Sequence, residues 1–234
     1  MRGMALAGGK AARVVAGQIV RDITAEKLAR LPAESALLTR YGVSRPSLRE
    51  AMRLLEMYGV ITLKPGPGGG AVVNQVASQE FATSTSLYFH LLGLTVGDLL
   101  QTRLNLEPLM ARMAAQKVKD GGVWQYTESD ATPDDGSRVQ RSEFHLAIAE
   151  LAGDPILVLF AHALRDITVH ALTEDRLRTV TMSDLTVSHE EIEAAIAAGQ
   201  PAKAERLMRT HTQDFIELLR MHVPHLLKQV IDWG

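Results

Sequence analysis

The stretch Leu31 to Val73, LPAESALLTRYGVSRPSLREAMRLLEMYGVITLKPGPGGGAVV, decides the fold of the N-terminal part of the chain. It contains two short helical patterns, Glu34 to Tyr41 and Arg45 to Tyr58, separated by a tight turn. Gly42 follows the first pattern, where a helix end favours glycine because glycine adopts the left-handed conformation at little cost. Ser44 precedes the second pattern and is expected to cap it by accepting a backbone N–H. The stretch therefore predicts two helices joined by a short turn.

The second of these helices has two distinct faces. At 100° per residue, apolar side chains share one face and arginines share another. The apolar face consists of Leu48, Ala51, Leu55 and Tyr58, and the cationic face consists of Arg45, Arg49 and Arg53. We expect the first face to pack in a core. Charged helix faces are usually only solvated, so the arginines do not by themselves establish a binding surface.

Two short apolar runs, Val60 to Leu63 and Ala71 to Val73, flank the turn KPGPGGG at residues 64–70. Apolar, β-branched runs around such a turn predict a hairpin. Its glycine-rich tip would let backbone amides approach a phosphate closely, and Lys64 adds a positive charge. The order of tight turn, Ser-capped arginine-faced helix and glycine-tipped hairpin predicts a winged helix-turn-helix that binds DNA.

The composition is that of an ordinary globular chain, with 46% hydrophobic and 22% charged residues among 234, a length that allows one or two domains. Residues 1–75 hold 11 Lys and Arg against 5 Asp and Glu, whereas residues 76–234 hold 14 against 22. The basic N-terminal part is therefore the one expected to face phosphate. The sequence has no apolar run long enough for a membrane span, no signal-peptide pattern and no cysteine, which suits a cytoplasmic protein.

The segments Leu31 to Glu34 and Tyr41 to Gly59, together with the glycine-rich tip, resemble the N-terminal domain of GntR-superfamily transcription regulators. In that family the helix that begins at the position of Ser44 enters the major groove, and the glycine tip approaches the minor groove. The resemblance implies double-stranded DNA as a partner, contacted by Ser44, Arg45, Ser47, Arg49, Lys64, Gly66 and Gly68. Many relatives have LPSER where this chain has LPAES, so Ser35 replaces an arginine that often contacts DNA.

We expect two domains, residues 1–75 and 80–234, joined by a linker at residues 76–79. Beyond the linker, a repeated 3.6-residue periodicity without alternation predicts an all-helical bundle. The expected fold is mainly α, with an N-terminal winged helix-turn-helix that has a small β wing and a C-terminal all-α helical bundle. A frayed N-terminus at residues 1–10 precedes a first helix over Ala11–Asp22. The bundle helices are expected at Gln79–Leu92, Val96–Lys119, Ser137–Leu151, Pro155–Arg178, Ser183–Ala198 and Pro201–Met221, with a polar loop at Asp120–Gly136 and a short tail helix to Trp233.

Three pieces of this second half resemble the all-helical, FCD-type ligand-binding domain of the FadR-like subgroup of the same superfamily. They are Arg103 to Glu107 before Ala114-Ala115, Phe144-His145 with Leu151 to Pro155, and His189 to Ala198 followed by Ala204 to His211. In related domains three histidines, often with an aspartate four residues before the first, hold a divalent metal that helps bind a small organic acid. The resemblance implies His145, His189 and His211 as ligands of zinc, nickel or a similar ion. Arg141 stands where the aspartate is usual.

The residues themselves leave two interpretations of these histidines open. A helical bundle builds metal sites from side chains that project inward from facing helices, and neutral imidazoles suit Zn²⁺ or Ni²⁺. Asn105 or Glu107 could supply a fourth ligand. Each histidine taken alone is instead typical of a hydrogen-bonded core residue, and the positive charge of Arg141, one helical turn before His145, disfavours an ion there.

Arg103 also has two interpretations. It could pair with Glu107 one turn later in the same helix, or its planar guanidinium could bind a carboxylate effector. If no metal is bound, Arg141 could supply the charge that holds the acid. We expect a homodimeric regulator, a repressor on a palindromic operator, and no enzymatic activity. The alternatives are a metal-sensing regulator and a three-histidine metal-dependent hydrolase, for which the sequence offers no separate general base.

Overall fold

The computed structural model describes residues 2–66, 69–74, 78–126, 138–173 and 187–233, and only the backbone of residues 2–8, 78 and 138–142 among them. Contacts divide the chain into two compact units, Met1–Glu80 and Phe81–Gly234. Of the expected linker, residues 76 and 77 lie outside the described part, and Ser78 already begins a helix.

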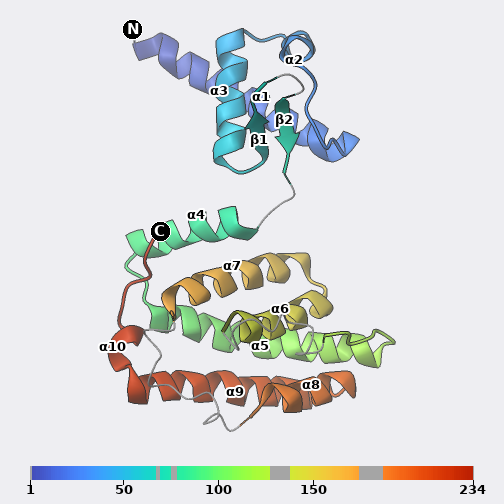
Figure 1. The fold of residues 1–234 in the computed structure, drawn as a ribbon, viewed down its shortest axis with the longest axis vertical. Helices are drawn as coiled ribbons and strands as arrows, with labels where there is room; N and C mark the ends of the chain where they lie inside the picture. Colours follow the sequence, from blue (N-terminus) through green and yellow to red (C-terminus); the bar gives the residue numbers. More distant parts are fainter. Residues whose placement is uncertain (1, 67–68, 75–77, 127–137, 174–186, 234) are drawn as a thin grey trace. The chain divides into compact units, whose positions relative to one another are not determined.

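The first unit is a winged helix-turn-helix, as predicted (Figure 1). β1 and β2 pair antiparallel, with Ile61 opposite Val73 and Lys64 opposite Gly70. Residues 29–31 extend this hairpin, because the Leu31 N–H donates to the Ala71 carbonyl at 2.9 Å and the Val73 N–H donates to the Ala29 carbonyl at 3.0 Å. The elements of the unit are α1 (Arg2–Glu26), α2 (Glu34–Tyr41), α3 (Arg45–Met57), β1 (Ile61–Lys64) and β2 (Gly70–Val73).

The turn between α2 and α3 follows the two local signals in the sequence. Gly42 ends α2 in the left-handed conformation, with φ of 61°, and the Ser44 side chain accepts the Ser47 N–H at the start of α3. The apolar face of α3 is buried at Leu48, Ala51 and Leu55 against α1 and β1. Tyr58 was expected on that face, but it is 67% exposed. The helix ends at Met57, so the helical spacing that would place Tyr58 on the buried face does not extend to it.

The N-terminal helix is longer than the sequence suggested. It begins at Arg2 and runs through Gly8 and Gly9, where fraying was expected. The residues on both sides of the glycines are largely Ala, Leu, Met and Lys, which are strong helix formers, so two glycines do not interrupt it. The buried side of α1 consists of Ala12, Val15, Ala16 and Ile19, which pack on α3.

The second unit is an all-helical bundle, which confirms the predicted class (Figure 1). α5 is its central helix and contacts α6, α7, α8 and α9, with α9 alongside it. The helices are α4 (Ser78–Leu91), α5 (Val96–Lys119), α6 (Arg138–Ala152), α7 (Pro155–Ala171), α8 (His189–Ala197), α9 (Pro201–His222) and α10 (Pro224–Leu227). Among the described residues, no helix is both long enough and apolar enough to cross a membrane.

Several helix ends differ from those expected. α7 ends at Ala171, whereas the pattern predicted a helix to Arg178, and residues 174–178 lie outside the described part. α8 begins at His189 because Ser188 and Glu191 form a reciprocal capping box. The tail helix is only the short α10: the backbone beyond it pairs with the turn before α5, where Val96 donates to Gln229 and Ile231 donates to Leu94.

The main core of the bundle lies beside the histidines. Ala111, Ala114 and Ala115 of α5 are fully buried, and such small side chains let neighbouring helices approach closely. Around them pack Phe144 and Ile148 of α6, Ile192 and Ile196 of α8, and Met208 of α9. These contacts bring α6, α8 and α9 together, and each of the three carries one of the candidate ligands.

Candidate DNA interface and candidate metal centre

The arginines of α3 lie on its exposed side. The side chains of Arg49 and Arg53 are 67% and 76% exposed, and Arg45 in the first turn is exposed as well. Arg49 Nε lies 3.8 Å from Glu34 Oε1, and Arg53 Nη1 lies 3.7 Å from Glu50 Oε2. Exposed pairs at such distances contribute little to stability, about 0–1 kcal/mol. Both guanidinium groups can therefore turn toward a phosphate or a base edge at small cost.

The hairpin places its basic and glycine residues at one end. Lys64, the last residue of β1, and Gly66, with φ of 91°, are both exposed. The Gly69 N–H donates to the Gly66 carbonyl at 2.8 Å, and a Cβ on Gly69 would lie 2.2 Å from the Lys64 carbonyl oxygen. The tight turn thus excludes a side chain at Gly69. Gly68, also expected at the interface, lies outside the described residues.

A groove of about 490 Å³ separates the start of α2 and the exposed side of α3 from the wing. Apolar side chains, among them Leu37, Leu48 and Leu63, line it together with Glu34, Arg49 and Arg53. Arg49 and Arg53 of α3 and the wing thus border one concave surface.

Arg30 contacts the wing, and the sequence analysis missed it. Its Nη2 donates to the Gly69 carbonyl at 3.0 Å, so it holds the end of the wing from the neighbouring segment. The sequence offers little indication of this contact, because Arg30 directly precedes Leu31-Pro32 in a segment without a periodic pattern.

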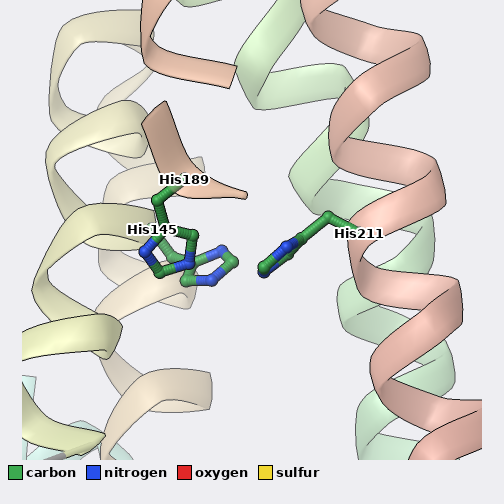
Figure 2. Close-up of side chains that lie close together, drawn as sticks. All are labelled: His145, His189 and His211. Carbon is green, nitrogen blue, oxygen red and sulfur yellow. The ribbon is translucent and has the colours of Figure 1, made fainter. Parts of the chain in front are cut away.

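Three histidines from three helices converge in the second unit (Figure 2). His145 lies in α6, His189 is the first residue of α8, and His211 lies in α9. One ring nitrogen of each lies within 4.8 Å of the other two. The ring centroids are 5.3 Å apart for His145 and His189, 5.5 Å for His145 and His211, and 4.8 Å for His189 and His211. His211 is buried and the other two are half-buried.

His211 is oriented by a backbone carbonyl. Its Nδ1 lies 2.9 Å from the carbonyl oxygen of Val187, which can only accept, so Nδ1 carries the proton of the neutral ring. Nε2 then keeps its lone pair. Burial lowers the pKa of His211 to about 4, and the electrostatic interaction with His145 acts in the same direction. The ring is therefore neutral near pH 7, which is the form that binds a metal ion.

Glu107 of α5 lies behind His145. Its Oε2 is 3.2 Å from His145 Nδ1 and accepts a hydrogen bond from Thr212 Oγ1 at 3.1 Å, and its Oε1 accepts from Arg103 Nε at 2.5 Å. Burial alone would raise the pKa of Glu107, but the charges of Arg103 and His145 outweigh it and hold this pKa well below its usual range. The carboxylate is therefore ionised.

These contacts show which of the other candidate site residues lie near the three histidine rings. Both oxygens of Glu107 already have partners, so the structure places it behind His145 rather than among the three converging rings. Arg103 forms the intrahelical pair with Glu107. Asn105 is exposed, because two residues along a helix correspond to a turn of about 200° away from buried Glu107. The side chain of Arg141 lies outside the described part.

The three imidazoles fit a divalent metal ion. Tetrahedral Zn–N bonds of about 2.0–2.1 Å place nitrogens about 3.3 Å apart, so the observed separations require shifts of about 1 Å in the rings. Metal-bound histidines usually donate their second N–H to a carbonyl or carboxylate, and Val187 and Glu107 stand in those positions for His211 and His145. Within the described residues, His145 Nδ1 is buried and lacks a hydrogen bond of good geometry, although Glu107 Oε2 lies 3.2 Å away.

A small cavity of about 20 Å³ adjoins His145 between α5, α6 and α7. Arg103, Glu107 and Arg165 line it together with apolar side chains, and it has room for about one water molecule. Arg165 of α7 pairs with Asp166 at 2.8 Å and with Glu143. The sequence analysis did not single out Arg165, because it matches no motif position.

Comparison with known proteins gives matches for both units. Residues 11–73 match bacterial regulatory proteins of the gntR family, and residues 98–214 match the FCD domain. The chain is 28% identical over 198 residues to the HTH-type transcriptional repressor NanR of Salmonella typhimurium (strain LT2) and, equally, of Salmonella arizonae, over 77% of this chain and 72% of each relative. The solved structure of Streptococcus agalactiae GntR is similar in fold, with a TM-score of 0.64 at 21% identity over 88% of this chain and 99% of that one.

Proposed function

Because the chain belongs to the GntR family of bacterial transcription regulators and is of the FadR-like type with an FCD domain, we propose that it is a repressor controlled by a small organic acid. The acid would bind in the helical unit and change the affinity of the winged unit for its DNA operator. The observation that carries this proposal is the convergence of His145, His189 and His211 beside the ionised Arg103–Glu107 pair, because clusters of interacting titratable groups occur preferentially at binding sites.

On the DNA side, we propose that α3 enters the major groove and the wing contacts the backbone nearby. Ser44, Arg45, Ser47 and Arg49 would supply groove and phosphate contacts, with Lys64, Gly66 and Gly68 at the wing. A homodimer would place two such units on a palindromic operator. Since DNA binding requires access to the chromosome, we place the protein in the cytoplasm.

In the helical unit, His145, His189 and His211 would hold a divalent ion such as Zn²⁺ or Ni²⁺. When bound, the ion would supply a positive charge for a carboxylate of the acid. Val187 orients the imidazole of His211, Glu107 lies against that of His145, and the side chain of Arg103, one turn before Glu107, is only 13% exposed. Arg103 and Arg141 are proposed as further contacts to the acid.

The regulatory effect would follow from linkage. An acid that binds one arrangement of the protein more tightly than another shifts the population toward it, by as much as the two affinities differ. Typical couplings correspond to about 5- to 150-fold changes in DNA affinity. The repressor class is supported by the similarity to NanR proteins, whose names describe repressors.

The experiment begins with an operator selected from a random-sequence duplex library by the purified full-length protein. Binding of that duplex would be measured by fluorescence anisotropy with Zn²⁺, with EDTA, and with a panel of hydroxy, keto and sugar acids. We expect one class of acid to change the affinity at least 5-fold with Zn²⁺ present, and no such change after EDTA treatment.

The variant His189→Ala should lose the response to the acid and still bind the duplex. His162→Ala is the matched control, since His162 is partly exposed and pairs with Glu150 on the surface of the same unit. A response in His189→Ala equal to that of the wild type would refute the histidine site. Failure to enrich any duplex sequence would refute the DNA-binding role.

One observation favours a second candidate, a metal-sensing regulator. The cavity beside His145 and Arg103 has a volume of about 20 Å³, room for about one water molecule and too little for an organic acid. If the ion itself is the signal, Zn²⁺ alone changes operator affinity and no acid adds to the effect. A three-histidine hydrolase lacks support from the described site, where Glu107 is already paired with Arg103 and Thr212 and is not placed as a general base.

A further inference from the structure

We infer that Trp124 and Glu193 are positioning residues that hold His189 in the histidine cluster, an inference that rests on the proposed metal site. His211 is oriented by the carbonyl of Val187, and His145 lies against Glu107. His189 lies at the first position of a helix of 9 residues, so its place depends on what fixes that helix.

A hydrogen bond joins the segment after α5 to α8. The indole Nε1–H of Trp124 donates to Glu193 Oε1 at 2.9 Å, and both side chains are partly buried. Glu193 follows His189 by four residues, which places the two side chains one above the other on the same face of α8. The bond therefore fixes α8 at the turn adjacent to His189.

A set of aromatic contacts reaches the same histidine from another direction. The His189 ring is stacked on Phe144 of α6, with centroids 4.1 Å apart and an interplanar angle of 20°. Trp124 meets Phe144 edge-on at 6.2 Å and 77°, and Tyr126 lies 5.9 Å from Phe144. Phe144 itself is buried, so Trp124 and Tyr126 complete the packing around the ring on which His189 rests.

The aromatic stacking and the hydrogen bond constrain different features of His189, the plane of its ring and its position. Stacking on Phe144 sets the plane of the His189 ring but does not set its distance from His145 and His211. The bond between Trp124 and Glu193 sets the position of α8 along that plane. Since metal ligands must be held within about 0.5 Å of their productive places, loss of either contact should loosen the third ligand.

The test measures Zn²⁺ affinity of the full-length protein by competition with a chelating dye. Removing partners that orient ligands typically costs about 10- to 100-fold in metal affinity. We expect a loss in that range for Trp124→Phe, which keeps a ring but removes the N–H donor, and for Glu193→Ala. Glu193→Gln keeps an acceptor and should restore affinity to within about 3-fold of the wild type. The double variant Trp124→Phe/Glu193→Ala should lose no more than either single variant, because both remove the same bond.

The matched control is Glu190→Ala, which removes an exposed negative charge from the same helix, next to His189. Its affinity should equal that of the wild type, which separates positioning from the loss of charge near the ion. Wild-type affinity in both Trp124→Phe and Glu193→Ala would overturn the inference. So would equal losses in Glu193→Gln and Glu193→Ala, because the acceptor would then be irrelevant.

A wild-type protein that takes up no Zn²⁺ would refute the metal site of the proposed function and would not settle the positioning role. That role is then decided in the metal-free protein by the NMR signals of the His189 ring protons, which stacking on Phe144 shields. We expect those signals to move downfield in Trp124→Phe and Glu193→Ala and to stay in place in Glu190→Ala. Unchanged signals in the first two variants would overturn the inference.

Discussion

Replacing Glu107 by glutamine should destabilise the helical unit by about 3 kcal/mol. The Glu107 side chain is 6% exposed, accepts from Arg103 and Thr212, and lies against His145. Glutamine keeps the shape but removes the negative charge that pairs with Arg103. Removing one partner of a buried ion pair costs about 3–5 kcal/mol. We expect the lower end, because glutamine keeps one acceptor and the Arg103 side chain retains 13% exposure.

The assay is urea unfolding of the metal-free protein at pH 7, followed by tryptophan fluorescence. Both tryptophans, Trp124 and Trp233, belong to the helical unit, so the signal reports on that unit. Linear extrapolation then gives the free energy of unfolding. The matched control is Glu217→Gln, which breaks an i,i+3 pair with Arg220 whose side chains are 49% and 58% exposed, and which should change stability by less than about 0.5 kcal/mol. Equal stability of Glu107→Gln and the wild type would refute the argument that this carboxylate is a buried, ionised partner.

Three further predictions concern the cap, the recognition helix and pH. Ser44→Ala should destabilise the winged unit by about 1 kcal/mol, because it removes the acceptor for the Ser47 N–H, and circular dichroism melts would test this. An unchanged melting temperature would contradict it. Arg49→Ala should weaken binding of the selected operator by about 1–3 kcal/mol in anisotropy titrations, and unchanged affinity would remove Arg49 from the interface. His211 has its pKa lowered to about 4 by burial, against about 6.5 when unfolded, so the unfolded state takes up the proton first as the pH falls. Stability present above pH 6.5 is then lost toward pH 4, by about 2 kcal/mol between pH 7.5 and 5 in urea unfolding of the metal-free protein. His211→Gln should lack this component, and an identical pH dependence in both proteins would contradict the assignment.

Local chemistry was sufficient to predict the fold class and most helix boundaries. Gly42 and Ser44 define the turn before α3 through their own backbone preferences, and Asp154 with Pro155 starts α7 in the same way. The error at the start of α1 is local, because the helix formers around Gly8 and Gly9 were underweighted, but the error at the C-terminus comes from a non-local contact. The tail helix to Trp233 is replaced by backbone pairing of residues 229–231 with the turn before α5, and periodicity contains no information about such pairing.

The candidate site was predictable in its residue types and less so in its contacts. Helical spacing gave the pair between Arg103 and Glu107 as one of two interpretations of Arg103, because i and i+4 side chains meet on one face, and the structure has this pair. The same spacing could not show that Glu107 would contact His145, because His145 belongs to another helix. Trp124 and Arg30 were missed because both lie in irregular segments, where position in the sequence does not determine which distant residue a side chain meets.

The structure also bears on the two interpretations of Arg103. A guanidinium has five N–H donors, and the pair with Glu107 engages Nε, so an ion pair and a bound carboxylate are not mutually exclusive. The adjoining cavity is the limiting factor, since Leu157, Ala161 and Leu164 of α7 leave room for about one water molecule beside Arg103. An acid that reaches Arg103 from this side must therefore displace α7 side chains, and its affinity depends on the cost of that displacement. An arrangement of the bundle in which α7 has already moved would bind the acid more tightly, which is the differential affinity that a regulatory effect requires.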